Sequence, residues 1–154
     1  MNFDIKFDFQ RRDRLGLIEA IWGQDKSIDQ LERLCENVLS KNEVVFITRI
    51  NSEKANYLLD LYDDARFYEE ANCLTIGKNL NKIITNKKVA IISGGSSDLA
   101  VTLEAQLALE IYGVNCQSFI DVGVAGLHRL MSQLEEINKY DVLIVCAGME
   151  GALA

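Results

Sequence analysis

The residues best suited to chemistry lie in the second half of the chain, beside three runs rich in apolar residues. These runs occupy residues 89–93, 117–122 and 142–147, and a short turn of small residues follows each. The candidates in and beside these turns are Gly94, Gly95, Ser96, Ser97, Asp98, Asp121, His128, Arg129, Gly148 and Glu150. Backbone N–H groups, hydroxyls and a guanidinium bind phosphate or carboxylate, whereas imidazole and carboxylate groups transfer protons. The combination indicates a site for an anionic ligand with acid–base chemistry.

A structural role is an alternative for most of these candidates. A glycine-rich turn between a strand and a helix can be only a tight connection, and Asp98 can cap the helix that follows it. His128 is the only histidine; it can hydrogen-bond a loop or carry a proton beside Arg129. We favour a functional role for Glu150, because a carboxylate in the apolar string GMEGA needs a partner or a task.

The elements around these residues have the rhythm of a parallel sheet. Residues 89–93 form an unbroken run typical of a strand buried on both faces, and residues 117–122 and 142–147 are predicted as two further strands. Helical patterns over residues 99–112 and 127–138 separate the strands. Such βαβ units place all strand ends at one sheet edge, where open α/β sheets bind ligands.

The first half of the chain is less regular and predicts a small α+β domain. Ser27 is expected to cap a helix over residues 28–41, and Asn51 or Ser52 a second helix reaching residue 64. Strands are expected at residues 44–50 and 73–77, whereas residues 15–23 fit either a strand or a helical turn. A polar linker over residues 78–88 leads to the proposed domains, 1–86 and 87–154.

Composition excludes several classes of function. The chain has 154 residues and a net charge of −7, and it contains no basic run, which argues against nucleic acid or an anionic membrane as partner. The charged N-terminus is unlike a signal peptide, and no apolar run is long enough to span a membrane. The cysteines, Cys35, Cys73, Cys116 and Cys146, lack zinc-site spacing. We therefore expect a cytoplasmic protein with reduced cysteines and no metal.

The three turns together resemble the LarB family. The strings SGGSSDLAVTLEA, FIDVGVAGLHRLMSQLEEI and DVLIVCAGMEGAL are similar to the first three turns of the LarB catalytic domain, which is related to PurE, the aminoimidazole ribonucleotide carboxylase. RRDRLGLIEAIWGQDKSIDQL, VVFITRI and FYEEANCLTIG resemble the LarB N-terminal domain. The resemblance implies an α/β protein in which a small N-terminal α+β domain precedes a partial flavodoxin-like (PurE-like) three-layer parallel sheet.

The same resemblance implies an activity. LarB proteins carboxylate the pyridinium ring of nicotinic acid adenine dinucleotide at carbon 5 with CO2 or bicarbonate, then hydrolyse the phosphoanhydride, in the biosynthesis of the nickel-pincer nucleotide cofactor. By this resemblance Ser97 and Asp98 hold the ribose-phosphate part, His128 and Arg129 match a His-Arg pair, and Glu150 is an acid/base. No tightly bound cofactor is implied, with CO2 or bicarbonate as co-substrate, and we expect a homo-oligomer.

Departures from the family pattern leave other interpretations open. LarB proteins usually carry proline at the positions of Ala100 and Ala154, and the cysteine that attacks the pyridinium is expected beyond Ala154. We therefore expect this chain alone to be incomplete as a catalyst, with further strands or another subunit covering its last strand. The alternatives are a PurE-type carboxylase acting on an imidazole ribonucleotide and a non-catalytic nucleotide-binding remnant.

Overall fold

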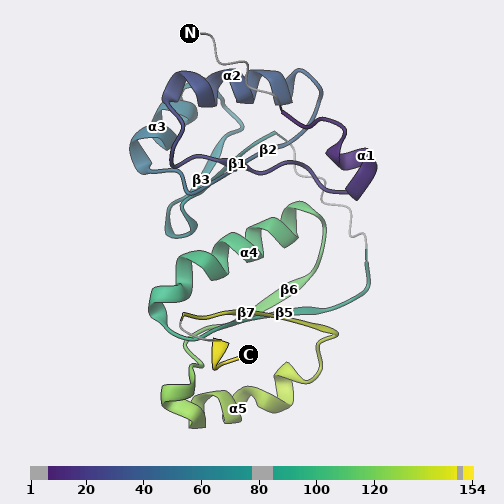
Figure 1. Ribbon diagram of the computed structural model, residues 1–154, viewed down its shortest axis with the longest axis vertical. Helices are drawn as coiled ribbons and strands as arrows, with labels where there is room; N and C mark the ends of the chain where they lie inside the picture. The colour runs from purple at the N-terminus through teal and green to yellow at the C-terminus, as the bar shows by residue number, and fades with distance from the viewer. Residues whose placement is uncertain (1–6, 78–84, 149–150) are drawn as a thin grey trace. The chain divides into compact units, whose positions relative to one another are not determined.

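The computed structural model describes residues 7–77, 85–148 and 151–154. The chain forms two compact units, residues 1–79 and 80–154, each with its own sheet (Figure 1). The expected α/β fold class is confirmed, since a mixed four-stranded sheet precedes a three-stranded parallel sheet flanked by helices. No helix within the described part of the chain is long and apolar enough to cross a membrane.

Unit 1 packs two helices on one face of a mixed sheet (Figure 1). The sheet order is β1-β2-β4-β3; β1 and β2 are parallel and the other pairs antiparallel. The elements in chain order are α1 Arg11–Leu15, β1 Ile21–Trp22, α2 Ile28–Leu39, β2 Val45–Thr48, α3 Ser52–Leu61, β3 Arg66–Tyr68, the 3-10 turn η1 Glu69–Ala71 and β4 Cys73–Ile76.

Both predicted helices of this unit begin where the sequence indicates. The Ser27 hydroxyl accepts a hydrogen bond from the Gln30 amide at 3.2 Å, and the Gln30 side chain accepts one from the Ser27 amide at 2.9 Å, which completes a capping box. Asn51 caps α3 by accepting from the Lys54 amide at 3.0 Å. The apolar side of α2 is buried on strands β2 and β4, which are buried throughout.

The sequence of residues 15–23 fits either a strand or a helical turn, but the structure divides this segment between the end of a helix and a short strand. Leu15 ends α1, Gly16 takes a left-handed conformation with φ 72°, and only Ile21 and Trp22 pair with β2 as a strand. The left-handed turn at Gly16 closes the helix because glycine has no Cβ to clash there. Of the expected linker over residues 78–88, residues 78–84 lie outside the described part of the chain.

Unit 2 is a three-stranded parallel sheet between two helices (Figure 1). Its order is β6-β5-β7, with α4 on one face and α5 on the other. The elements are β5 Val89–Ser93, the turn η2 Ser96–Asp98, α4 Leu99–Ile111, β6 Cys116–Phe119, the turn η3 Val124–Gly126, α5 Leu127–Ile137 and β7 Val142–Cys146. The predicted βαβ order is therefore confirmed.

The central strand β5 is buried along its whole length, as its unbroken apolar run predicts. Ala90 and Ile92 pack against Phe119, Val122 and Ile137 on the side of α5. By contrast, Val142 and Leu143 at the start of β7 are 48% and 49% exposed, because β7 is an edge strand of the sheet. The fully buried strand β5 therefore leads directly into the first candidate turn.

Candidate functional site

The three candidate turns meet at the carboxyl edge of the unit 2 sheet. The Gly94 amide, just after β5, donates to the Cys146 carbonyl at the end of β7 at 3.0 Å. On the other side, the Val122 amide donates to the Ser93 carbonyl at 3.0 Å. Because all three strands are parallel, their ends and the turns that follow share one edge, as the sequence predicts.

Glycine is required where the turns touch. A Cβ atom on Gly123 would lie 2.2 Å from the carbonyl oxygen of Gly94, so no other residue fits between the first and second turns. A Cβ on Gly94 would lie 3.4 Å from the Cβ of Ala147 in the third turn and 3.2 Å from Oδ2 of Asp98. The small residues therefore allow direct backbone contact at this edge, which is the packing role of glycine in such turns.

Asp98 closes the first turn. Its Oδ2 accepts a hydrogen bond from the Gly95 amide at 2.9 Å within η2. The side chain makes no capping bond to α4, so the proposed cap on that helix is wrong, and the carboxylate instead holds the turn before it. Ser96 and Ser97 in the same turn are exposed, so their hydroxyls are accessible to a ligand.

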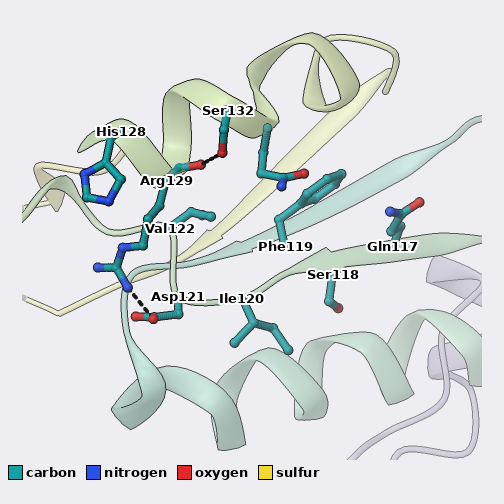
Figure 2. Close-up of a pocket in the computed structure, with 10 residues that line it drawn as sticks. Gln117, Ser118, Phe119, Ile120, Asp121, Val122, His128, Arg129 and Ser132 are labelled. Atoms are coloured by element: carbon teal, nitrogen blue, oxygen red, sulfur yellow. Dashed lines mark hydrogen bonds and ion pairs between the residues drawn. The ribbon is translucent and has the colours of Figure 1, made fainter. Parts of the chain in front are cut away.

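An ion pair joins the second turn to α5. Arg129 donates from Nη1 to the Asp121 carboxylate, and both side chains are partly exposed (Figure 2). Asp121 takes a left-handed conformation with φ 61°, which ends β6 earlier than the predicted strand over residues 117–122. The Arg129 side chain lies over Gly126, where a Cβ would be 2.5 Å from Nε. The pair presents a guanidinium that is held in place by a carboxylate.

An open hollow of about 560 Å³ lies beside β6 and the first half of α5 (Figure 2). Asp121, His128, Arg129 and Ser132 line it, and His128 is exposed at the start of the helix. The Ser132 hydroxyl donates to the Arg129 carbonyl at 2.7 Å. The hollow therefore brings together a guanidinium for an anion and an imidazole for proton transfer.

The remaining described candidates are not among the residues that line this hollow. The structure places Gly94, Gly95, Ser96, Ser97 and Asp98 in the first turn, and none of them is among the residues that line the hollow. Gly148 is exposed in the third turn and no atom lies within 4 Å of its missing Cβ. Glu150 lies outside the described residues.

Ser93 is a site residue that sequence reasoning missed. Its fully buried hydroxyl accepts a hydrogen bond from the Asp121 amide at 3.3 Å and donates to the Gly95 carbonyl at 3.4 Å. It therefore connects the first and second turns. The available signal was a single hydroxyl residue at the end of an otherwise apolar strand, since a buried hydroxyl needs partners.

Within the described residues, neither a reactive thiol at Cys146 nor a group of side chains that could bind a metal ion is found. Burial raises the pKa of the Cys146 thiol, a hydrogen bond with Thr102 opposes this shift, and the Asp98 charge adds to it. The thiol at the end of β7 is therefore protonated at neutral pH and belongs to the strand, as expected. No group of three or more His, Cys, Asp or Glu side chains that could hold a metal ion occurs in the part of the chain that the structure describes.

Comparisons with known proteins find a family match for the first unit. Residues 3–78 match the LarB/PurE-like N-terminal domain, which confirms the expected resemblance for this half of the chain. The chain is also 35% identical, over 157 residues, to the uncharacterized protein MJ0165 of Methanocaldococcus jannaschii. That alignment covers 97% of this chain and 61% of the archaeal protein. The chain therefore spans less than two thirds of the length of this relative.

Proposed function

Because residues 3–78 form a LarB/PurE-like N-terminal domain, we propose that the protein carboxylates a pyridine nucleotide. The substrate is nicotinic acid adenine dinucleotide, the carboxyl donor is CO2 or bicarbonate, and phosphoanhydride hydrolysis follows, in nickel-pincer cofactor biosynthesis. The observation that carries the proposal is the meeting of the three candidate turns at one edge of the unit 2 sheet. We further propose that the protein works in the cytoplasm as a homo-oligomer, without a tightly bound cofactor.

Arg129 is the proposed anchor for the anionic part of the substrate. In the free protein Asp121 neutralises its guanidinium in the hollow beside β6. A phosphate or carboxylate can take bidentate hydrogen bonds from the remaining guanidinium N–H groups. The exposed hydroxyls of Ser96 and Ser97 supply further donors in the first turn. The Gly94 and Gly95 amides shape that turn instead, because they donate to the Cys146 carbonyl and to Oδ2 of Asp98. Together the guanidinium and the two hydroxyls fit a ligand with more than one anionic group.

His128 and Glu150 are the proposed proton carriers. His128 is exposed at the start of α5, where its imidazole can exchange protons with a ligand in the hollow. Glu150 follows the third strand, and its role is carried over from the family string AGMEGAL. None of the four cysteines matches the family nucleophile, so the complete reaction requires a cysteine from outside these residues.

Calorimetric titration with nicotinic acid adenine dinucleotide tests the proposal at its first step. We expect saturable binding to the native chain and a loss of affinity of about tenfold or more in Arg129→Ala, because a charge-assisted hydrogen bond is removed. Lys139→Ala is the matched control, since Lys139, two residues after the end of α5, also forms an exposed ion pair, with Glu136 at 2.5 Å, and neither residue lines the hollow.

The alternatives give different results in the same titration. Preferential binding of aminoimidazole ribonucleotide would indicate a PurE-type carboxylase. For turnover, the protein that includes any chain beyond Ala154 is incubated with labelled bicarbonate, and the nucleotide product is examined by mass spectrometry for one added carboxyl group. Dinucleotide binding without incorporation of label by that protein would favour the non-catalytic nucleotide-binding remnant.

A further inference from the structure

Unit 1 carries an aromatic–guanidinium pair at the carboxyl end of its two parallel strands. Trp22 is the last residue of β1, and Arg49 directly follows β2, its parallel neighbour. The Arg49 Cζ lies 4.5 Å from the centroid of the Trp22 ring, within the range of a cation–π interaction. Trp22 is 43% exposed and Arg49 is also exposed. The pair is therefore open to solvent rather than part of the core.

The Arg49 backbone is held in an uncommon conformation. Its φ of 52° lies in the left-handed region, which residues other than glycine rarely adopt. Hydrogen bonds anchor the residues on both sides: the Gly23 amide donates to the Thr48 carbonyl at 2.8 Å, and the Ile50 amide donates to the Asn72 carbonyl at 2.9 Å. These bonds fix the turn from which the guanidinium reaches the ring on the neighbouring strand.

The Trp22 ring and its loop are equally fixed. The indole N–H donates to Oδ2 of Asp25 at 3.1 Å. Lys54, on α3, donates from Nζ to the carbonyls of Gly23 at 3.0 Å and Gln24 at 2.8 Å. A Cβ on Gly23 would lie 2.9 Å from Cγ2 of Ile47, so the loop packs directly on β2. Because these protein groups are already held in place, binding of a ligand here costs little conformational entropy of the protein.

The pair offers two kinds of contact to one ligand. An exposed indole and a planar guanidinium stack on a flat aromatic ring. Guanidinium N–H groups also bind phosphate or carboxylate bidentately, and no carboxylate pairs with Arg49 within residues 7–77, in contrast to Arg12 and Arg14. We propose that Trp22 and Arg49 form a binding site for a flat aromatic anion of the nucleoside monophosphate class. This site belongs to unit 1 and does not depend on the activity proposed for unit 2.

The chain contains one tryptophan, so its fluorescence reports on this site alone. The protein is titrated with AMP, with adenosine and with inorganic phosphate, and is excited where adenine does not absorb. We expect saturable quenching by AMP, weaker quenching by adenosine and none by phosphate, because the site needs both ring and charge. Quenching by phosphate equal to that by AMP, or no response to AMP, would overturn the proposal.

Two variants of Arg49 distinguish a role of its guanidinium in ligand binding from a role in folding. Arg49→Gly adopts the left-handed backbone without strain, so the variant should fold at least as stably while AMP affinity falls about tenfold or more. Arg49→Lys keeps the charge but loses the planar donor fork, and should bind with intermediate affinity. Unchanged affinity in Arg49→Gly would overturn the proposal. A fluorescence shift that follows protein concentration without AMP would assign the pair to a protein contact and would also overturn it.

Discussion

The Oγ atom of Ser93, the last residue of β5, lies 3.3 Å from the backbone nitrogen of Asp121 in the neighbouring turn and accepts its hydrogen bond. The same hydroxyl donates to the Gly95 carbonyl at 3.4 Å. One buried side chain thus ties the turn that carries Ser96 and Ser97 to the residue that pairs with Arg129. The geometry of the candidate site depends on a residue that contributes no group to its surface.

Ser93→Ala should destabilise unit 2 by about 1–3 kcal/mol, the usual cost of leaving a buried donor unsatisfied. The residue is fully buried, so water does not readily replace the lost hydroxyl. Urea unfolding of both proteins measures the difference. Ser132→Ala is the control, because its exposed hydroxyl donates to the Arg129 carbonyl of its own helix; a change within about 0.5 kcal/mol is expected. Equal effects of the two substitutions would contradict the role given to Ser93.

Gly123→Ala should disrupt the contact between the first two turns. The new Cβ would lie 2.2 Å from the Gly94 carbonyl oxygen, a backbone atom that cannot move without displacing the end of β5. Overpacking of this kind costs at least about 1–3 kcal/mol. Gly148→Ala is the matched control in the third turn, where no atom lies within 4 Å of the added methyl group. Thermal unfolding of both variants should show a clear loss for Gly123→Ala only.

Much of unit 2 was predictable because its signals are local. The apolar runs give β5 and β7 to within one residue, and the helical patterns give α4 and α5 equally well. The convergence of the turns follows from parallel topology, which the βαβ rhythm indicates without any knowledge of contacts. In unit 1, the Ser27 capping box was equally visible, since its two partners are three residues apart.

What could not be predicted depends on contacts between residues distant in sequence. Residues 120–122 look like the end of a strand, but Asp121 turns left-handed where its amide meets Ser93, 28 residues earlier in the chain. The Asp121–Arg129 pair likewise depends on how the second turn folds back towards α5. No periodicity in the sequence reports such contacts, so the roles of Ser93 and Asp121 in shaping the site became visible only in the structure.

Acid should weaken unit 2 through Asp141. The Lys88 amide donates to Oδ2 and the Lys87 ammonium to Oδ1, both at 2.9 Å, and these contacts lower the carboxyl pKa below its usual 3.8. A lowered pKa stabilises the fold above 3.8, and this stabilisation is lost as pH falls through the folded-state value. Asp141→Asn should therefore flatten the dependence of melting temperature on pH in acid. Asp64→Asn, which removes one carboxylate from an exposed position in unit 1, is the control for the loss of a single negative charge.

Alkali should weaken unit 1 through Cys35. Burial raises the pKa of this thiol from 9.0 to about 12, and the charges of Glu32 and Glu36 add to the shift. Between these two values the unfolded chain loses a proton that the folded chain retains, so stability falls as pH rises, by at most about 1.4 kcal/mol per pH unit.

Urea unfolding on either side of pH 9 measures how steeply the free energy of unfolding falls with pH. Cys35→Ala should reduce this slope by the contribution of the one thiol that it removes. Cys35→Ala also removes buried volume and lowers stability at every pH, so the test is the slope and not the absolute value. Tyr62→Phe is the control, because burial raises the pKa of that phenol from 10.0 to about 12 and its effect begins at higher pH. Identical slopes just above pH 9 in the native protein and in Cys35→Ala would show that the thiol does not control the alkaline limit of unit 1.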